Sequence, residues 1–552
     1  MTTAAAALLL AAALALLLPR GAAAFSSSPS AAERFSRRHR TAPPSMAADS
    51  DDAENKNSSS SETKSYDLVV IGGGSAGLTA AKFASTFGFS SVIIEKSRLG
   101  GDCTWTGCVP SKSLVASAKA ARVVRKAEDY GVIVGDKNGG GDVTVDMKRV
   151  MGRMRENMER IYEEDDSPAA MAKLGIDTLV GSARFTSADT LSVTSSTTTT
   201  EVRANEGIVI CTGAKPRRPT SDDIPGLDDD VEYLTYDEIF EIEDLPPRIT
   251  VAGGGPIGCE LAQVFGRFGS EVTVVARRLL PKCEPVVSET LATVFEKEGI
   301  NVVQGTIASV AKDGKGHTAA CQCSDGSEVS VSGDLLLVAV GRIPVAFGMG
   351  LDDVGIDVDP STGGIAVDDN LRTSLRGVYA AGDCTGGAQF THYAGYQGAV
   401  AARNVLLPLT DPGVLPNVPG TTFTDPEVAT AGLTEAEAIE EYGEGKVSVA
   451  VQKVRDIDRA ICDGADEGLI KIVYKKRGYK ILGATIMSPA AGEMIAEIGV
   501  AMKTGLTFDM LATVMHTYPA YSFALQAMAA EVYYDKLLKS KGLFSVLKKI
   551  GL

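Results

Sequence analysis

The sequence predicts an α/β protein with two Rossmann-like dinucleotide-binding domains, because one strand–glycine–helix pattern occurs twice. The first copy has a strand over 66–71, a glycine-rich segment over 72–77 and a helix as far as 87. The second copy has a strand over 249–252, a glycine-rich segment over 253–258 and a helix as far as 268. Glycines at these positions permit a tight turn, the approach of a pyrophosphate, and close packing of helix on strand. A chain of 552 residues with 44% hydrophobic content is large enough for two or three domains.

The charge and the cysteine content exclude two classes of protein. The net charge is −16 and the pI is about 4.9, whereas nucleic-acid binding needs a basic surface. The nine cysteines are scattered along the chain, unlike those of a secreted disulfide scaffold. The composition therefore predicts no nucleic-acid partner and fits a reduced compartment with one working cysteine pair.

The first 64 residues are expected to be a targeting leader and a linker. Residues 4–18 are apolar but short for a membrane span, and small residues follow at 22–24, so 1–24 is typical of a signal peptide. Residues 25–64 begin as a Ser- and Arg-rich transit-like segment and end in a polar linker expected to be disordered. This two-part leader resembles plastid import leaders; the secretory pathway and the mitochondrion are the alternatives. No transmembrane segment is expected in the mature chain.

An acidic residue after the first glycine-rich segment supports a nucleotide site there. A second strand over 91–94 ends in Glu95, about 20 residues after the glycines, where a carboxylate can accept hydrogen bonds from ribose hydroxyls. The helix N-terminus would stabilise the phosphate charge. The residues expected at this site are Gly72, Gly74, Ser75, Ala76, Gly77 and Glu95.

Segment 100–112 carries two cysteines in a pattern suited to redox chemistry. Cys103 and Cys108 are five positions apart, and Gly107 precedes the second, so the chain can turn back and close a small disulfide ring. A strained bridge near the surface is easily opened by a hydride donor or a thiolate. A helix N-terminus and Lys112 would lower a thiol pKa, so that Cys108 could persist as a thiolate. Two unconnected core cysteines are the alternative.

The second glycine-rich unit lacks an acidic residue at the ribose position. Its second strand, 271–276, is followed by two arginines, whose guanidinium groups can bind a 2′-phosphate that a carboxylate would repel. We therefore predict NADPH in preference to NADH; a solvated basic turn is the alternative. The residues expected at this site are Gly253, Gly255, Ile257, Gly258, Glu260, Arg277, Arg278 and Gly341.

From 66 to 534 the sequence resembles the class I pyridine nucleotide–disulfide oxidoreductases, which include glutathione reductase, dihydrolipoamide dehydrogenase and mercuric reductase. The resemblance is carried by segment 100–112, closest to the mercuric-reductase-like branch, and by 373–383, which is similar to the second flavin motif of the family. It implies FAD at the first unit, NAD(P)H at the second and a redox-active Cys103–Cys108 disulfide. Cys108 would lie nearest the flavin, and Cys103 would attack the substrate.

The same resemblance assigns further residues and domains. Lys112, paired with Glu260, would tune the flavin edge, and Thr212, Gly213 and Asp383 would complete the flavin site. An α+β C-terminal domain would form a homodimer in which each active site takes residues from the partner chain. The implied domains are FAD-binding at 65–218 and 346–415, NAD(P)H-binding at 219–345, dimerisation at 418–535 and a basic amphipathic tail at 536–552.

The sequence departs from the family pattern at the acid–base group. The family's disulfide reductases place a His before a Pro, with an orienting Glu five residues later; here Tyr518 precedes Pro519, and Phe523 takes the place of the Glu. A phenol is a poor base at neutral pH but can donate a hydrogen bond. His516 is the other candidate, and a structural role for it is the alternative.

The acceptor is therefore left open between three functions. The favoured one passes hydride from NADPH through FAD to Cys103–Cys108 and on to an acceptor, as in redox homeostasis. The second is a quinone or metal-ion reductase whose electrons leave from FAD. Mercuric reductase carries a C-terminal cysteine pair for its metal, and this chain has no cysteine after Cys462, so Hg(II) reduction rests on analogy; no resident metal is expected. The third is a flavin redox sensor with low turnover.

Overall fold

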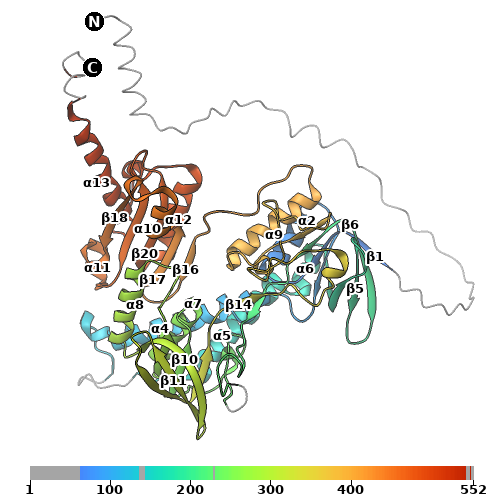
Figure 1. Cartoon of the computed structure of the whole chain (residues 1–552), viewed down its shortest axis with the longest axis horizontal. Helices are drawn as coiled ribbons and strands as arrows, with labels where there is room; N and C mark the ends of the chain where they lie inside the picture. Colours follow the sequence, from blue (N-terminus) through green and yellow to red (C-terminus); the bar gives the residue numbers. More distant parts are fainter. Residues whose placement is uncertain (1–62, 136–142, 228–230, 543–547, 549–552) are drawn as a thin grey trace, which may run out of the picture.

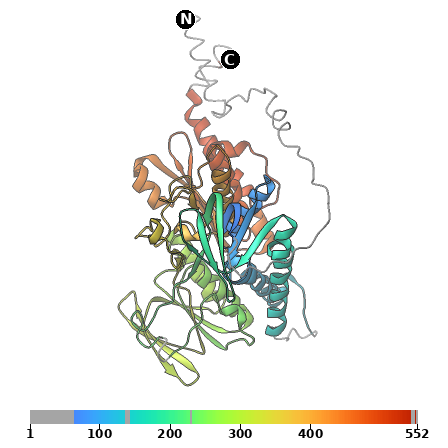
Figure 2. The ribbon, with the colours of Figure 1, turned by 90° about the vertical axis from the view of Figure 1, so that its right-hand side faces the viewer.

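The computed structural model describes residues 63–135, 143–227, 231–542 and 548. The expected leader and most of the expected C-terminal tail lie outside these residues. Figure 1 shows three parts: one built on the blue-to-teal first sheet, one built on the green-to-yellow second sheet, and the orange-to-red C-terminal part. In the view turned by 90° (Figure 2), the second sheet and the C-terminal part again lie at opposite ends.

The first part is a seven-stranded sheet whose central strands are parallel. Its order is β3-β2-β1-β6-β5-β4, and β15 pairs with β6. The chain therefore completes this sheet only after it has formed the second one. The strands are β1 (Lys64–Ile71), β2 (Ser91–Glu95), β3 (Ile176–Val180), β4 (Ser182–Phe185), β5 (Thr190–Thr194), β6 (Thr199–Ile210) and β15 (Val378–Ala380). β1 begins two residues before Tyr66, because Lys64 pairs with Val202 of β6.

Helices cover one face of this sheet and extend from it toward the second part. α2 (Ser75–Thr86) and α9 (Thr391–Leu406) pack together over the central strands and share a buried apolar cluster with them. The helices between β2 and β3 are α3 (Gly101–Trp105), α4 (Cys108–Arg125), η1 (Ala127–Tyr130), α5 (Met147–Ile161), the π-helical turn η2 (Tyr162–Asp166) and α6 (Pro168–Lys173).

The second part is a six-stranded sheet of order β12-β11-β10-β9-β8-β13. Its parallel strands are β8 (Arg248–Ala252), β9 (Glu271–Ala276), the start of β10 (Asn301–Asp313) and β13 (Leu335–Val338); β11 (Gly316–Cys323) and β12 (Glu328–Gly333) add an antiparallel extension. The helices are α7 (Pro256–Phe268), α8 (Pro285–Lys297) and the short η3 (Ile239–Glu241). β7 (Ala214–Pro216) and β14 (Arg342–Pro344) pair where the chain enters and leaves this part.

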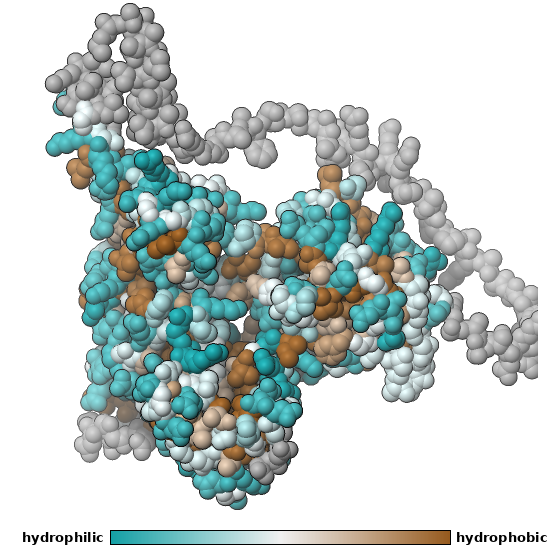
Figure 3. Space-filling view, viewed as in Figure 1, coloured by the Kyte–Doolittle hydropathy of each residue, from teal (hydrophilic) through white to brown (hydrophobic). Residues whose placement is uncertain are grey.

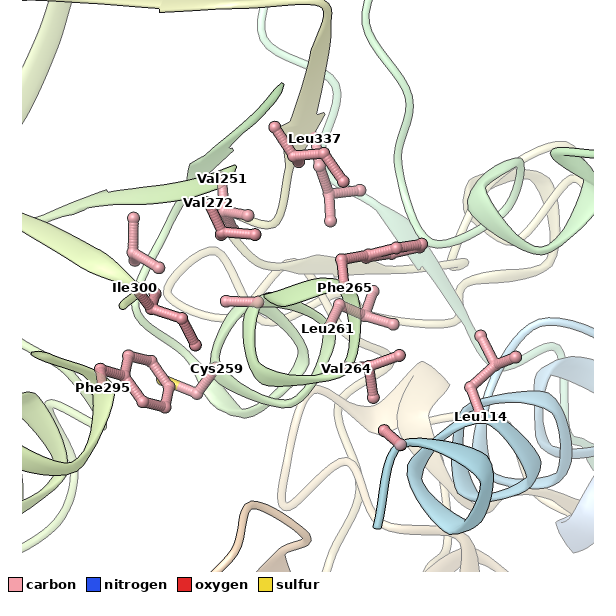
Figure 4. Packing of buried hydrophobic residues seen from close by; sticks show 14 of the residues in the cluster. Leu114, Val251, Cys259, Leu261, Val264, Phe265, Val272, Phe295, Ile300 and Leu337 are labelled. Carbon is pink, nitrogen blue, oxygen red and sulfur yellow. The ribbon is translucent and has the colours of Figure 1, made fainter. Parts of the chain in front are cut away.

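A shared core joins the second part to the redox helices. Phe265 of α7 packs toward the sheet residues Val251 and Leu337, and Leu114 of α4 lies beside α7 (Figure 4). All four side chains are fully buried. Burying apolar surface contributes roughly 25 cal/mol per Å², so this cluster fixes α4, and with it Cys108, against the second nucleotide unit.

The C-terminal part is an antiparallel sheet with α12 and α13 packed on one face and α10 on the other. Its order is β16-β17-β20-β19-β18, and the buried cluster beneath it includes residues of α12 and α13. Its elements are β16 (Gly420–Thr422), β17 (Glu427–Gly432), α10 (Glu435–Tyr442), η6 (Glu444–Lys446), β18 (Val447–Lys453), η7 (Val454–Asp456), α11 (Asp458–Asp463), β19 (Leu469–Lys475), β20 (Ile481–Ser488), α12 (Ala491–Thr504), η8 (Phe508–Thr513) and α13 (Phe523–Lys539). The first four residues of the expected tail belong to α13. None of the described helices has both the length and the apolar composition to cross a membrane.

Candidate active site

The two cysteines lie on either side of a break between two helices. α3 carries Cys103, the chain turns at Gly107, and α4 begins at Cys108. The turn requires glycine, because a Cβ at residue 107 would lie 2.7 Å from the carbonyl oxygen of Asp102. No disulfide joins the two cysteines, and their side chains are hydrogen-bonded to each other. The structure thus brings together the two sulfurs that the sequence pairs.

The surroundings of the pair divide the protonation states between the two sulfurs. The hydrogen bond from Cys103 is the largest influence that lowers the pKa of Cys108 to about 6. The Thr391 hydroxyl, 3.3 Å from Cys108 Sγ, and the charge of Lys112 lower this pKa further against the effect of burial. The hydrogen bond to Cys108, followed by burial, raises the pKa of the Cys103 thiol. At neutral pH the reduced pair therefore holds a thiolate at Cys108 and a proton at Cys103.

A charged bridge beside Cys108 connects the three parts of the molecule. Lys112 Nζ of α4 lies 2.9 Å from Glu260 Oε2 of α7, so the expected pair is present. Glu260 is buried, and its other oxygen accepts a hydrogen bond of 2.8 Å from the backbone N–H of Phe423. The Lys112 ammonium also lies 4.5 Å from the centroid of the Phe423 ring. This bridge holds a positive charge near the thiolate.

The first glycine-rich turn has the shape that a dinucleotide needs. Gly72 has φ +106°, and a Cβ there would lie 2.2 Å from the carbonyl oxygen of Cys211. Gly74 caps α2 without a side chain, which leaves the N–H groups of the first turn available to a phosphate. Glu95 ends β2, and its carboxylate accepts from the backbone N–H of Gly73 at 2.8 Å. These residues fit FAD: the α2 N-terminus would hold the pyrophosphate, and Glu95 the ribose.

The remaining residues expected at the flavin site converge on this turn from distant strands. The Ser75 hydroxyl donates to the carbonyl oxygen of Thr391 at 3.0 Å, and the Thr212 hydroxyl donates to that of Val345 at 2.6 Å. Asp383 accepts from the guanidinium of Arg342, which also bonds Asp102, the residue before Cys103. The role of Asp383 in the flavin site stays a prediction. Arg342 is the group that ties Asp383 to the redox segment.

The second glycine-rich turn repeats the geometry of the first. Gly253 has φ +119°, and a Cβ there would lie 2.4 Å from the carbonyl oxygen of Ala339. At Gly255, the residue before α7, a Cβ would meet no described atom within 4 Å, so there is open space for a phosphate. Arg277 is exposed at the end of β9, whereas Arg278 Nη2 donates to carbonyl oxygens of its own turn, including that of Cys283 at 3.1 Å. Both arginines are exposed and line one cavity, and the role of each toward a 2′-phosphate stays a prediction.

One continuous cavity of about 2360 Å³ reaches both turns and the cysteine pair. Its lining includes Gly74, Cys103, Cys108, Gly255 and Arg277. Apolar side chains gather around the hollow where the three parts of the molecule meet (Figure 3). The cavity is large enough for two dinucleotides, because drug-sized pockets are roughly 300–1,000 Å³.

The two residues expected to act as acid or base lie in the C-terminal part. His516 Nε2 is 2.8 Å from Glu497 of α12, and its Nδ1 is 2.9 Å from the carbonyl oxygen of Val514. The Tyr518 hydroxyl donates to Asp458 of α11 at 2.7 Å, and this bond raises the pKa of the phenol. Among the described residues of a single chain, neither lines the cavity that contains Cys103. Their catalytic role stays a prediction that requires a partner chain.

Sequence reasoning missed three residues that contact the site. Thr391 and Phe423 are separated from Cys108 and Lys112 by hundreds of positions, and Arg342 is 240 positions from Asp102. The available signal for Thr391 was a polar residue at the start of a helix near the flavin motif, where a side chain at a sheet's carboxyl edge faces the ligand. Nothing comparable marked Phe423.

Two dinucleotide sites and a dithiol along one cavity define a flavin- and nicotinamide-dependent redox enzyme. Residues 66–398 match the model of the family described as "Pyridine nucleotide-disulphide oxidoreductase", and residues 418–529 match the model of that family's dimerisation domain. The chain belongs to the pyridine nucleotide–disulfide oxidoreductase family. It is thus an NAD(P)H-dependent flavoprotein disulfide oxidoreductase that uses FAD and NAD(P)H.

Relatives and solved structures span most of the chain. The mercuric reductase of Bacillus cereus is 34% identical over 474 residues, 85% of this chain and 72% of that protein. The dihydrolipoyl dehydrogenase of Chlorobaculum tepidum is 32% identical over 468 residues, 84% of this chain and 96% of that protein. The HOCl-induced flavoprotein disulfide reductase RclA of Escherichia coli, as its Cu(II) complex, aligns with a TM-score of 0.72 at 26% identity, and LpdA of Mycobacterium tuberculosis with 0.74 at 26%. These two alignments cover 85% of this chain and 100% of each solved chain.

Proposed function

We propose that this enzyme transfers electrons from NADPH to the Cys103–Cys108 disulfide and from there to a small-molecule acceptor. Bound FAD would supply the relay between the nicotinamide and the disulfide. The observation that carries the proposal is the single cavity lined by both glycine-rich turns and by both cysteines. The hydrogen bond from Cys103, which lowers the pKa of Cys108, supports it. Cys108 would face the flavin as a thiolate, and Cys103 would attack the acceptor.

The choice of NADPH rests on the charge at the end of β9. Arg277 is exposed there and lines the cavity, and the residue before it, at the end of the strand, is Ala276 where a NADH site would carry an acid. A guanidinium binds a phosphate through two parallel hydrogen bonds. At this position a 2′-phosphate could therefore form hydrogen bonds and a charge interaction with Arg277, whereas a ribose hydroxyl carries no charge to attract the guanidinium.

The acceptor is proposed to be a small disulfide, with a quinone or metal ion as the second candidate. The second candidate is favoured by a specific observation: Tyr518 stands at the position of the family's catalytic base, and its bond to Asp458 raises the pKa of the phenol. A group that keeps its proton cannot deprotonate a thiol between turnovers. Named relatives include a mercuric reductase and a Cu(II) complex, so Hg(II) and Cu(II) belong among the acceptors to be tried.

A panel of acceptors tested with two proteins separates these functions. Wild type and Cys103→Ser would be assayed for NADPH oxidation with glutathione disulfide, lipoamide, a benzoquinone, Hg(II) and Cu(II). Loss of turnover in Cys103→Ser supports electron flow through the cysteines. Turnover with the quinone that survives in Cys103→Ser selects direct transfer from the flavin. Negligible turnover across the panel, with NADPH still bound, selects a redox sensor.

Homodimer formation and a plastid location complete the proposal. The match to the family's dimerisation domain supports a dimer whose partner supplies Tyr518 or His516, and sedimentation of the purified enzyme tests its oligomeric state. The leader sequence supports import into a plastid, with the secretory pathway and the mitochondrion as the alternatives. A fusion of residues 1–64 to a fluorescent protein would locate the mature product.

A further inference from the structure

The interior of the redox segment is attached to a distant π-helical turn by an aromatic stack. Trp105, the only tryptophan in the sequence, lies between the two cysteines. The guanidinium of Arg98 lies 3.3 Å from the centroid of the Trp105 ring and 4.4 Å from that of Tyr162, the first residue of η2. The two aromatic rings also meet edge to face, with centroids 5.0 Å apart.

Two hydrogen bonds and an ion pair fix this stack. Trp105 Nε1 donates to the carbonyl oxygen of Leu99 at 2.7 Å, and Arg98 Nη2 lies 2.8 Å from Glu159 of α5. The fully buried Thr104 donates from its hydroxyl to Asp166, the last residue of η2, at 2.8 Å. The segment between the cysteines is therefore held at both ends of the same π-helical turn.

A π-helical turn is rare and is frequently found at functional sites. Here its extra residue sets the spacing between the aromatic contact and the carboxylate contact: Tyr162 and Asp166 are its two ends, and the backbone N–H of Ser167 closes it on the carbonyl oxygen of Tyr162 at 2.7 Å. The backbone at Gly100 also lies close to Thr104 and Trp105. A Cβ at Gly100 would lie 2.9 Å from Thr104 Cβ and 3.0 Å from Trp105 Nε1.

We propose that Trp105 and Thr104 are positioning residues that set the thiol–disulfide equilibrium of Cys103 and Cys108. Closing the ring joins the two sulfurs, passes two electrons to the oxidant and releases the one proton that Cys103 carries beside the Cys108 thiolate. Glutathione disulfide, the oxidant in the test below, takes the two electrons and becomes two glutathione thiols, with its second proton taken from water. The equilibrium constant for this step depends on how often the two sulfurs meet, which is their effective concentration. A segment fixed at both ends of η2 keeps them together, and a loosened one shifts the equilibrium toward the dithiol. The inference rests on the proposed role of these cysteines as the redox pair.

The test is a redox titration that needs no turnover. Purified full-length protein, with FAD and after its removal, would be equilibrated in glutathione buffers of graded ratio using glutathione disulfide as the oxidant. Free thiols would be alkylated, and the alkylated fraction of Cys103 measured by mass spectrometry. We expect Trp105→Leu and Thr104→Val each to shift the midpoint toward the dithiol by about tenfold, which is about 30 mV for a two-electron couple.

Two comparisons separate positioning from general destabilisation. Thr104→Ser keeps the hydroxyl and is expected to restore the wild-type midpoint. Phe87→Leu removes an aromatic ring of the same domain that stacks on Phe83, and it is expected to leave the midpoint unchanged even if it lowers the melting temperature. If Trp105→Leu fails to fold, the comparison of Thr104→Val with Thr104→Ser tests the proposal.

Each outcome has one meaning. Midpoints at the wild-type value in both Trp105→Leu and Thr104→Val, or a shift that Phe87→Leu reproduces, would overturn the proposal. Full NADPH turnover in Cys103→Ser would instead remove the proposed function and leave the titration result intact, so the two failures are distinguishable.

Discussion

Replacing Thr391 by valine removes one donor to the Cys108 sulfur and changes little else in shape. The hydroxyl belongs to the first residue of α9 and lies 3.3 Å from Cys108 Sγ. It is one of three groups that lower the pKa of Cys108, and the other two are Cys103 and Lys112. A hydrogen bond to a charged group contributes about 1.5–3 kcal/mol. One pKa unit corresponds to about 1.4 kcal/mol. Taking the low end because sulfur is a weak acceptor, we expect the pKa of Cys108 to rise by about one unit.

The sign of the change follows from the form that is stabilised. The pKa of Cys108 is lowered in the native site, so the thiolate is present above about pH 6 and is lost as the pH falls through that value. In Thr391→Val the same loss occurs at higher pH, so at neutral pH a larger share of Cys108 carries a proton. Reactions that need the thiolate are expected to slow in proportion to the fall in the fraction of Cys108 that is ionised.

The assay is the rate of iodoacetamide alkylation of the reduced protein as a function of pH, resolved for Cys108 by mass spectrometry. Thr79→Val is the matched control, because the Thr79 hydroxyl donates to the carbonyl oxygen of Ser75 within α2. The control is expected to titrate like wild type. An unchanged Cys108 midpoint in Thr391→Val would refute the role given to this hydroxyl.

Three further substitutions test other parts of the account. Arg277→Ala is expected to raise the KM for NADPH about tenfold and leave that for NADH unchanged; equal effects in steady-state assays with both would contradict the phosphate contact. Tyr518→Phe removes a proton donor and is expected to slow disulfide turnover about tenfold or more, while quinone turnover stays as in wild type; stopped-flow rates equal to wild type for both acceptors would exclude the residue. Arg267 is nearly buried and bonds Glu298 through two nitrogens at 2.8 and 2.7 Å. Arg267→Met removes both hydrogen bonds to the Glu298 carboxylate, and urea denaturation should show that the free energy of unfolding falls by about 3 kcal/mol. An unchanged free energy of unfolding would show that the pair does not contribute to stability.

Features that depend on neighbours along the chain were predictable from the sequence. The turns at Gly72 and Gly253 follow from strand–glycine–helix spacing, and both have the positive φ that favours glycine. The pairing of Cys103 with Cys108 follows from their spacing of five positions and from the glycine before the second cysteine. The Lys112–Glu260 pair needed the family resemblance, because 148 positions separate the two residues.

Contacts decided by tertiary packing were not predictable. Thr391 reaches Cys108 across 283 positions, and no periodicity links the two. Arg278 carries the residue type expected of a phosphate ligand, but the turn that follows it presents carbonyl oxygens that its side chain bonds. The π-helical turn at Tyr162 lies within a segment whose sequence reads only as helix, so its link to Trp105 becomes visible only in three dimensions.

The central claim is that electrons from NADPH arrive at Cys103 and Cys108. The most direct measurement is anaerobic addition of one equivalent of NADPH to the oxidised enzyme, followed by alkylation and mass spectrometry of the peptide that contains both cysteines. The account predicts that this peptide passes from a bridged, unlabelled form to one with two alkylated cysteines. A peptide that stays bridged while the flavin absorbance bleaches would contradict it.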